Sequence, residues 1–185
     1  MNRPSKVDFP VEKVRRYLEP GPVVLVSSAC DGERDIMTLG WHTVMAFSPS
    51  TVGCVIAADN HSFDLIRRSG ECVINLPTAD LVDEVIGVGN TSGEIFDKFE
   101  RFHLTAEPGG SVAAPRVVEC HANFECRLVD DRLVEDRNFF VFEVVRARVS
   151  PELVYPETLH YTGDGVFMVS GQTIYRRDQF LSQMV

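Results

Sequence analysis

The 185-residue sequence lacks the motifs that mark several large classes of protein. It has no Gly-x-Gly-x-x-Gly run behind its first predicted strand and no Gly-x-x-x-x-Gly-Lys run, so Rossmann and P-loop folds have no support. It has no Gly-x-Ser-x-Gly elbow, which argues against a hydrolase of that type. No apolar run approaches the roughly 18 residues that a membrane-spanning helix needs. The polar N-terminus predicts no signal peptide.

The cysteines are odd in number and widely spaced, and acidic residues outnumber basic ones. The isolated histidines and the absence of a Cys-x-x-Cys pair predict no metal site. The odd number of cysteines and their apolar neighbours indicate small buried side chains in a reducing cytoplasm; they are Cys30, Cys54, Cys72, Cys120 and Cys126. Eighteen Lys and Arg against 27 Asp and Glu give a net charge of −9. This balance argues against nucleic-acid binding, which needs a basic surface.

The length suits a single domain, residues 1–185, with a sizeable core. Short β-branched runs between turn residues predict about seven strands, which makes the chain mainly β with inserted helices. The predicted strands cover 23–29, 36–48 with a bend near Gly40, 52–58, 71–77, 116–131 and 138–150. Capping residues and apolar spacing predict helices over 59–70 and 78–90, and a short helix within 91–102. Strands joined mostly by hairpins favour a closed or partly closed antiparallel barrel.

The strand predicted over 116–131 alternates in polarity. Glu119, His121, Asn123 and Glu125 share one parity, and the residues between them are mostly apolar. This pattern predicts one face on the core and one face toward solvent or a partner.

Several strand ends and helix starts carry side chains that suit a ligand. His61 and Ser62 open a predicted helix, whose free backbone N–H groups suit a phosphate, and Lys98 could supply a positive charge. Trp41, together with Met37 and Phe167, could form flat or polarisable walls for a ring system. The residues alone also allow plainer roles, because Trp41 could be core packing, Lys98 a solvated helix residue and Asn75 a strand-end hydrogen-bonding group. Alternation along the strand would turn either Trp41 or His42 away from a ligand, and we favour Trp41 as the ligand-facing residue.

The order of these segments resembles the flavin reductase-like family, which has the FMN-binding split-barrel fold, and in particular its flavoredoxin type. The resemblance covers roughly residues 20–149 and rests on a Ser-Pro after the third strand and on two specific runs, "RRSGECVINLP" and "SGEIFDKF". It implies a split β-barrel that binds FMN.

The resemblance also implies which residues approach the cofactor. The segment near the isoalloxazine ring is Met37, Thr38, Leu39, Gly40 and Trp41. The segment around the ribityl chain and phosphate contains Ala57, Ala58, Asp59, His61 and Ser62. Further residues near the pocket are Asn75, Ser92, Gly93, Lys98 and, as a late aromatic, Phe167.

The resemblance implies the activity of an NAD(P)H-dependent flavin reductase. The partners it implies are NADH or NADPH and a flavin or other electron acceptor. In such an enzyme FMN accepts a hydride at N5, and the protein orients and tunes the ring. A homodimer is implied as well. There are three alternatives. The first is an FMN-containing, flavoredoxin-like electron carrier reduced by a protein partner. The others are a non-catalytic flavin-binding protein and a degenerate barrel that binds haem or another heterocycle.

Three residues depart from the family pattern. Asp35 stands where many relatives have asparagine, and it would oppose an anionic neighbour. Asn138 stands near a position often held by histidine, and Phe142 stands where glycine is frequent. A phenylalanine at that position could narrow the space for a nicotinamide or a second flavin, which would favour the electron carrier.

Overall fold

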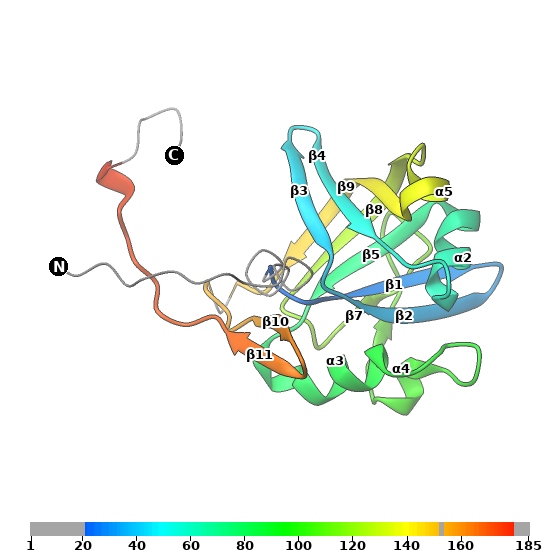
Figure 1. The fold of residues 1–185 in the computed structure, drawn as a ribbon, viewed down its shortest axis with the longest axis horizontal. Coiled ribbons are helices and arrows are strands. Elements are labelled where there is room, and N and C mark those ends of the chain that lie inside the picture. The colour runs from blue at the N-terminus through cyan, green and yellow to red at the C-terminus, as the bar shows by residue number, and fades with distance from the viewer. Residues whose placement is uncertain (1–20, 152–153, 180–185) are drawn as a thin grey trace, which may run out of the picture.

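The computed structural model describes residues 21–151 and 154–179. Its main element is one antiparallel sheet of seven strands in the order β2-β1-β5-β8-β9-β4-β3 (Figure 1). The strands are β1 (Val24–Cys30), β2 (Glu33–Leu39), β3 (His42–Phe47), β4 (Ser50–Val55), β5 (Glu71–Leu76), β8 (Ala122–Asp130) and β9 (Phe139–Val149). The fold is therefore mainly β, as the sequence predicts.

The connection between β2 and β3 closes this sheet into a barrel. These strands lie at opposite edges of the strand order, yet only Gly40 and Trp41 separate Leu39 from His42. Three peptide units span at most about 11 Å, so the two edges must converge at this corner. Trp41 O also accepts a hydrogen bond from Val55 N (2.9 Å), which joins the corner to β4. Along the rest of β2 no strand within the described residues pairs with its outer side, so the barrel is split there.

Helices pack against β2 at the split of the barrel. The first is α2 (His61–Ser69), which ends at Gly70 in the left-handed conformation that glycine favours. It is followed by η2 (Ala79–Leu81), α3 (Val82–Gly89) and α4 (Lys98–Arg101). Asp97 caps α4 by accepting hydrogen bonds from Phe99 N and Glu100 N. One hydrophobic core lies inside the barrel around Phe140, and a second lies between the sheet and α3 around Phe99.

Two small hairpins complete the described fold. β10 (Leu159–Gly163) pairs with β11 (Val166–Val169), and Val23 N donates to Leu159 O (2.7 Å), which holds this hairpin beside the start of β1. β6 (Ala106–Glu107) pairs with β7 (Arg116–Val117). The short helices α5 (Val134–Arg137) and η3 (Arg177–Gln179) are the remaining elements.

The structure corrects two strand predictions. Residues 36–48 form parts of two strands on opposite sheet edges, because the bend at Gly40 is a complete change of edge. Residues 116–131 form β7, a turn and β8, and the polar face predicted to meet solvent or a partner is partly covered by the chain itself. Glu125 is only 1% exposed and accepts hydrogen bonds from Gly110 N and Ser111 N, which belong to the covering loop.

The cysteines behave as predicted, since all five are free and four of them are buried. Among the described residues, no helix is both long and apolar enough to cross a membrane. No group of three or more His, Cys, Asp or Glu in the same part of the chain is placed to hold a metal ion.

Candidate functional site

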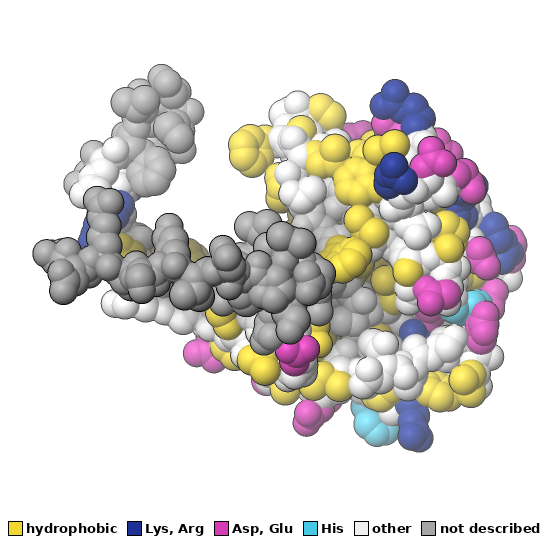
Figure 2. All heavy atoms as spheres, in the orientation of Figure 1, with side chains coloured by type: hydrophobic (Ala, Val, Ile, Leu, Met, Phe, Trp, Pro, Cys, Tyr) yellow, Lys and Arg dark blue, Asp and Glu magenta, His cyan; other side chains and the backbone are white. Residues whose placement is uncertain are grey.

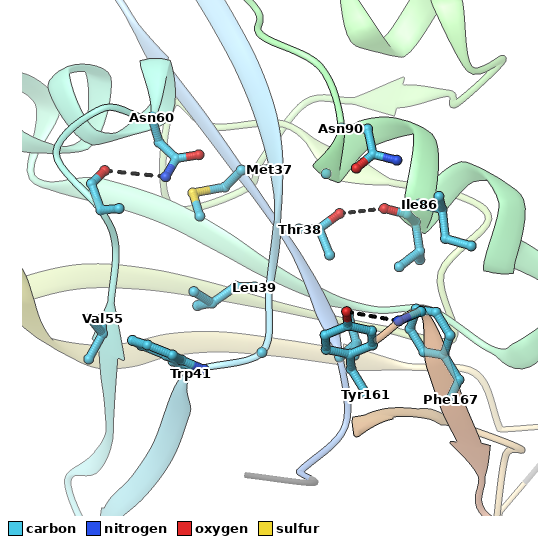
Figure 3. A pocket seen from close by; sticks show the side chains of 16 residues that line it. Met37, Thr38, Leu39, Trp41, Val55, Asn60, Ile86, Asn90, Tyr161 and Phe167 are labelled. Carbon is cyan, nitrogen blue, oxygen red and sulfur yellow. Dashed lines mark hydrogen bonds between the residues drawn. The ribbon is translucent and has the colours of Figure 1, made fainter. Parts of the chain in front are cut away.

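A cavity of about 490 Å³ lies beside β2, in the split of the barrel. Met37, Thr38 and Leu39 of β2 run through it between two walls (Figure 3). One wall is the end of β4 and the loop to α2, and the other is α3 with the β10–β11 hairpin. The volume lies in the usual range for a small-molecule or cofactor site, about 300–1,000 Å³.

The β1–β2 hairpin determines which backbone groups face this cavity. Asp31 and Gly32 both have positive φ, as a two-residue type I′ turn requires. The pair that flanks such a turn, Cys30 and Glu33, exchanges hydrogen bonds, and hydrogen-bonded pairs then alternate along the ladder. By this alternation, the N–H and C=O groups of Ile36 and Thr38 point away from β1, toward the free edge. Thr38 therefore offers one donor and one acceptor at the centre of the cavity.

The side chain of Thr38 holds helix α3 against this strand edge. Thr38 Oγ1 donates a hydrogen bond to Val85 O (2.7 Å), so α3 is tied to β2 on one side of the cavity. Gly89 lies one turn further along α3, where a Cβ atom would come within 3.2 Å of the Thr38 side chain. A glycine at this position lets the helix approach the strand closely.

One end of the cavity is aromatic. Trp41 lies across from Tyr161 and Phe167, whose ring centroids are 5.1 Å apart (Figure 3). Tyr161 accepts a hydrogen bond at its hydroxyl from Gly165 N (3.2 Å), which fixes the turn of the β10–β11 hairpin. Trp41 is 54% exposed although it is large and apolar, so its ring is available to a flat ligand.

The other end of the cavity is polar and carries no formal charge. Asn60 and Asn90 lie there on opposite walls (Figure 3). Asn60 is the N-cap residue of α2. Its side-chain amide donates to Ala57 O, and its side-chain oxygen accepts no hydrogen bond from the first turn of the helix. The first N–H groups of α2 thus remain available to an acceptor, and the helix dipole favours an anion near them.

The cavity brings together seven of the fifteen residues that the sequence assigns to the cofactor. They are Met37, Thr38, Leu39, Gly40, Trp41, Ala57 and Phe167. The other eight are not among the described residues that line it; they are Ala58, Asp59, His61, Ser62, Asn75, Ser92, Gly93 and Lys98. Trp41 lines the cavity, whereas His42 does not and instead has its Nε2 hydrogen-bonded to Pro22 O (2.7 Å).

Three of the eight predicted residues that do not line the cavity surround Asp35 instead. Ser62 Oγ donates to Asp35 Oδ2 (2.7 Å), and Lys98 Nζ lies 3.4 Å from Asp35 Oδ1. Gly93 packs so closely against Asp35 that a Cβ atom there would collide with Oδ1. Asp35 and Lys98 are both buried, at 2% and 5% exposure. The neighbour of Asp35 is therefore a cation rather than an anion, and Lys98 is not a solvated helix residue.

The remaining predicted residues have other surroundings. His61 Nε2 lies 3.0 Å from Glu33 Oε1, Asp59 and Ala58 are exposed, and Ser92 Oγ accepts a hydrogen bond from Glu94 N. Asn75 is fully buried, where its side chain donates to Leu25 O and accepts from Val117 N. Its contacts fit the plainer role, which is to join neighbouring strands.

Phe142 does not narrow the cavity. It is fully buried inside the barrel and stacks on Phe140 with ring centroids 5.8 Å apart. Asn138 ends α5 in the left-handed conformation, and its carbonyl accepts a hydrogen bond from Ile56 N. The expectation that Phe142 could restrict access of a nicotinamide is therefore wrong, and its argument for the electron carrier no longer holds.

Sequence reasoning missed several lining residues. They are Val23, Val55, Asn60, Val85, Ile86, Gly89, Asn90, Tyr161 and Gly165. The one available signal was Asn60, a recognisable cap residue beside the predicted phosphate segment. Which face of α3 would meet β2 depends on long-range packing, and nothing local in the sequence indicates it.

A family model described as "Flavin reductase like domain" matches residues 15–170, so the chain belongs to the flavin reductase-like family. An uncharacterised protein of Archaeoglobus fulgidus is 33% identical over 135 residues, which are 73% of this chain and 76% of that protein.

Solved structures agree on the fold. The flavoredoxin from Methanosarcina acetivorans has a TM-score of 0.82 and 23% identity, with 98% of this chain and 100% of that chain covered. An FMN-binding domain of a flavin reductases-like enzyme from Shewanella baltica has a TM-score of 0.79 and 23% identity, with 91% and 95% covered. At these identities the likeness shows the fold, which is the split barrel.

Proposed function

We propose that this protein binds FMN in the cavity beside β2 and acts as an NAD(P)H-dependent flavin oxidoreductase. The observation that carries the proposal is the combination of the free backbone edge at Thr38 with an aromatic end and a polar end of the same cavity. The donor and acceptor of Thr38 suit the polar edge of an isoalloxazine ring. The polar end, where α2 begins at Asn60, suits the phosphate.

Bound FMN would supply the redox chemistry, by taking up a hydride from the nicotinamide and passing electrons to an acceptor. The protein would bind and orient the ring through Thr38 and restrict water through Trp41, Tyr161 and Phe167. No acid or base side chain is needed for a hydride transfer of this kind. This agrees with a lining that, among the described residues, contains no Lys, Arg, His, Asp or Glu.

The test is a flavin spectrum followed by anaerobic reduction. The purified protein should bind FMN in the micromolar range or tighter, and NADH or NADPH should bleach the bound flavin within seconds. Flavin that stays oxidised with both nucleotides, yet is reduced by dithionite, would identify a carrier served by a protein partner. A protein with no measurable FMN affinity would refute the proposal.

A homodimer in the cytoplasm is also part of the proposal. β3 is an edge strand, and its apolar residues Val44, Met45 and Phe47 are 64%, 51% and 91% exposed. Figure 2 shows hydrophobic side chains gathered over the β3–β4 hairpin, a pattern typical of an interaction surface. Light scattering should give twice the chain mass for the wild type and a monomer for Phe47→Asp. A wild-type monomer at working concentration would contradict the dimer. The free cysteines support a reducing compartment.

A further inference from the structure

The buried group Asp35, Ser62 and Lys98 has a charge arrangement that the lining of the cavity does not explain. Asp35 Oδ2 accepts a hydrogen bond from Ser62 Oγ. Its other oxygen, Oδ1, is buried without a hydrogen-bond partner among the described residues and faces Lys98 Nζ at 3.4 Å. A buried charge is costly unless it is paired, so each of these two charges depends on the other.

Lys98 also reaches the free edge of β2. Its Nζ donates a hydrogen bond to Ile36 O (2.8 Å), and the carbonyl of Ile36 points away from β1, as do the backbone groups of Thr38. Two residues along a strand advance roughly 7 Å, so the ammonium group lies about that far from the backbone of Thr38 along the same edge. Lys98 therefore occupies the edge position next to the cavity without entering it.

The pair lies beside a lining that, among the described residues, contains no charged side chain. Asp35 shares its strand face with Met37 and Leu39, which line the cavity. Burial lowers the pKa of Lys98 below its ordinary value, while the attraction of the Asp35 carboxylate opposes this shift. Water screens the two charges poorly, because the side chains alone are only 4% exposed for Lys98 and 1% exposed for Asp35.

We propose that Asp35 is a positioning and charge-compensating residue, which neutralises Lys98 and so keeps the redox potential of a flavin at the β2 edge lower than Lys98 alone would set it. This rests on the proposed function. Oxidised flavin takes up two electrons and one proton on reduction by a hydride, so the anionic reduced form carries one more negative charge. An uncompensated ammonium group near the cavity would favour that reduced form.

The decisive variant is Asp35→Asn, which removes the charge and keeps the size. A unit charge acting over about 10 Å at an effective dielectric of about 20 changes an equilibrium by roughly tenfold. Asp35→Asn should therefore raise the affinity for reduced FMN over oxidised FMN by about tenfold. For a two-electron couple this is a rise of about 30 mV in the midpoint potential. Equilibrium reduction against a reference dye measures the shift.

Two further variants separate charge from structural damage. Lys98→Met should shift the potential in the opposite direction, because it leaves the carboxylate unpaired. The double variant Asp35→Asn with Lys98→Met should return to within threefold of the wild-type affinity ratio. A matched control is Asp97→Asn, which removes a charge one residue from Lys98 in a pair with Arg34 that is 30% and 40% exposed. It keeps the helix cap and should change the ratio by less than twofold.

Each outcome of these measurements either supports or overturns the role of Asp35. The role is supported if the two single variants shift the midpoint potential in opposite directions and the double variant cancels the shift. If one single variant does not fold, the other single variant and the double variant still test the role. A folded, FMN-binding Asp35→Asn protein with an unchanged potential overturns it, as does a double variant that shifts like Asp35→Asn. A wild-type protein that retains no FMN would instead refute the proposed function itself.

Discussion

The polar end of the cavity makes the orientation of FMN testable through Asn60→Asp. Asn60 lines the cavity at the N-terminus of α2. The substitution changes one side-chain atom and adds a negative charge where the phosphate is proposed to lie. A phosphate ester carries about −1.5 to −2 charges at neutral pH. Repulsion over about 6 Å amounts to about 1 kcal/mol at a dielectric of about 80, and to about 2 kcal/mol at about 40.

We therefore expect Asn60→Asp to weaken FMN binding about tenfold and to leave riboflavin binding unchanged, because riboflavin lacks the phosphate. Aspartate caps a helix as well as asparagine does, and its charge suits the helix dipole, so the stability of the flavin-free protein should stay equal or rise slightly. Fluorescence quenching of both flavins and thermal unfolding measure these effects. Asn60→Ser is the control, since it keeps a capping side chain without a charge. Equal losses for FMN and riboflavin would refute a phosphate at Asn60.

Three other substitutions test the assigned roles. Trp41→Ala should weaken FMN and riboflavin alike, by about 1 kcal/mol for a lost aromatic contact, with little change in melting temperature, because this side chain is 54% exposed. Asn75→Ala should cost about 2–4 kcal/mol in urea unfolding, since it removes several buried hydrogen bonds; unchanged stability would contradict its role between strands. Glu125 is buried, which raises its pKa, but the N–H groups of Gly110 and Ser111 outweigh this and hold the pKa below its ordinary 4.5. Its stabilising effect is present above about pH 4.5 and is lost as the pH falls through the lower folded-state pKa, so Glu125→Gln should be less stable at pH 7 and converge with the wild type in acid.

The sequence predicted the parts of the site that depend on local pattern. The residue pattern predicted a strand with a bend near Gly40, the family resemblance implied that the run from Met37 to Trp41 approaches the cofactor, and the structure places all of this run in the cavity. Gly70 was recognisable as a helix end because the left-handed conformation favours glycine. These features follow from backbone preferences over a few residues.

The missing parts depend on contacts between distant segments. Tyr161 reaches the cavity because Val23 N pairs with Leu159 O, a contact between residues 136 positions apart in the chain. Helix position, charge and the family resemblance marked Ser62 and Lys98 as ligand residues. None of these could show that Asp35, for which an anionic neighbour was expected, would engage both of them. A polar side chain near a site has the same sequence signature whether it faces a ligand or another buried polar group.

The free edge of β2 explains why these groups belong to one site. An unpaired strand edge is a liability, because its N–H and C=O groups need partners and attract other chains. The protein covers part of this edge itself: Lys98 takes the carbonyl of Ile36, and α3 packs against Thr38 through the bond to Val85 O. The two-residue corner at Gly40 and Trp41 closes the next part. The backbone N–H and C=O of Thr38 lie at the cavity on the same edge, and a flat ligand with a donor and an acceptor on one side can pair with them as a neighbouring strand would. The proposed flavin would therefore take the place of a neighbouring strand at this part of the β2 edge.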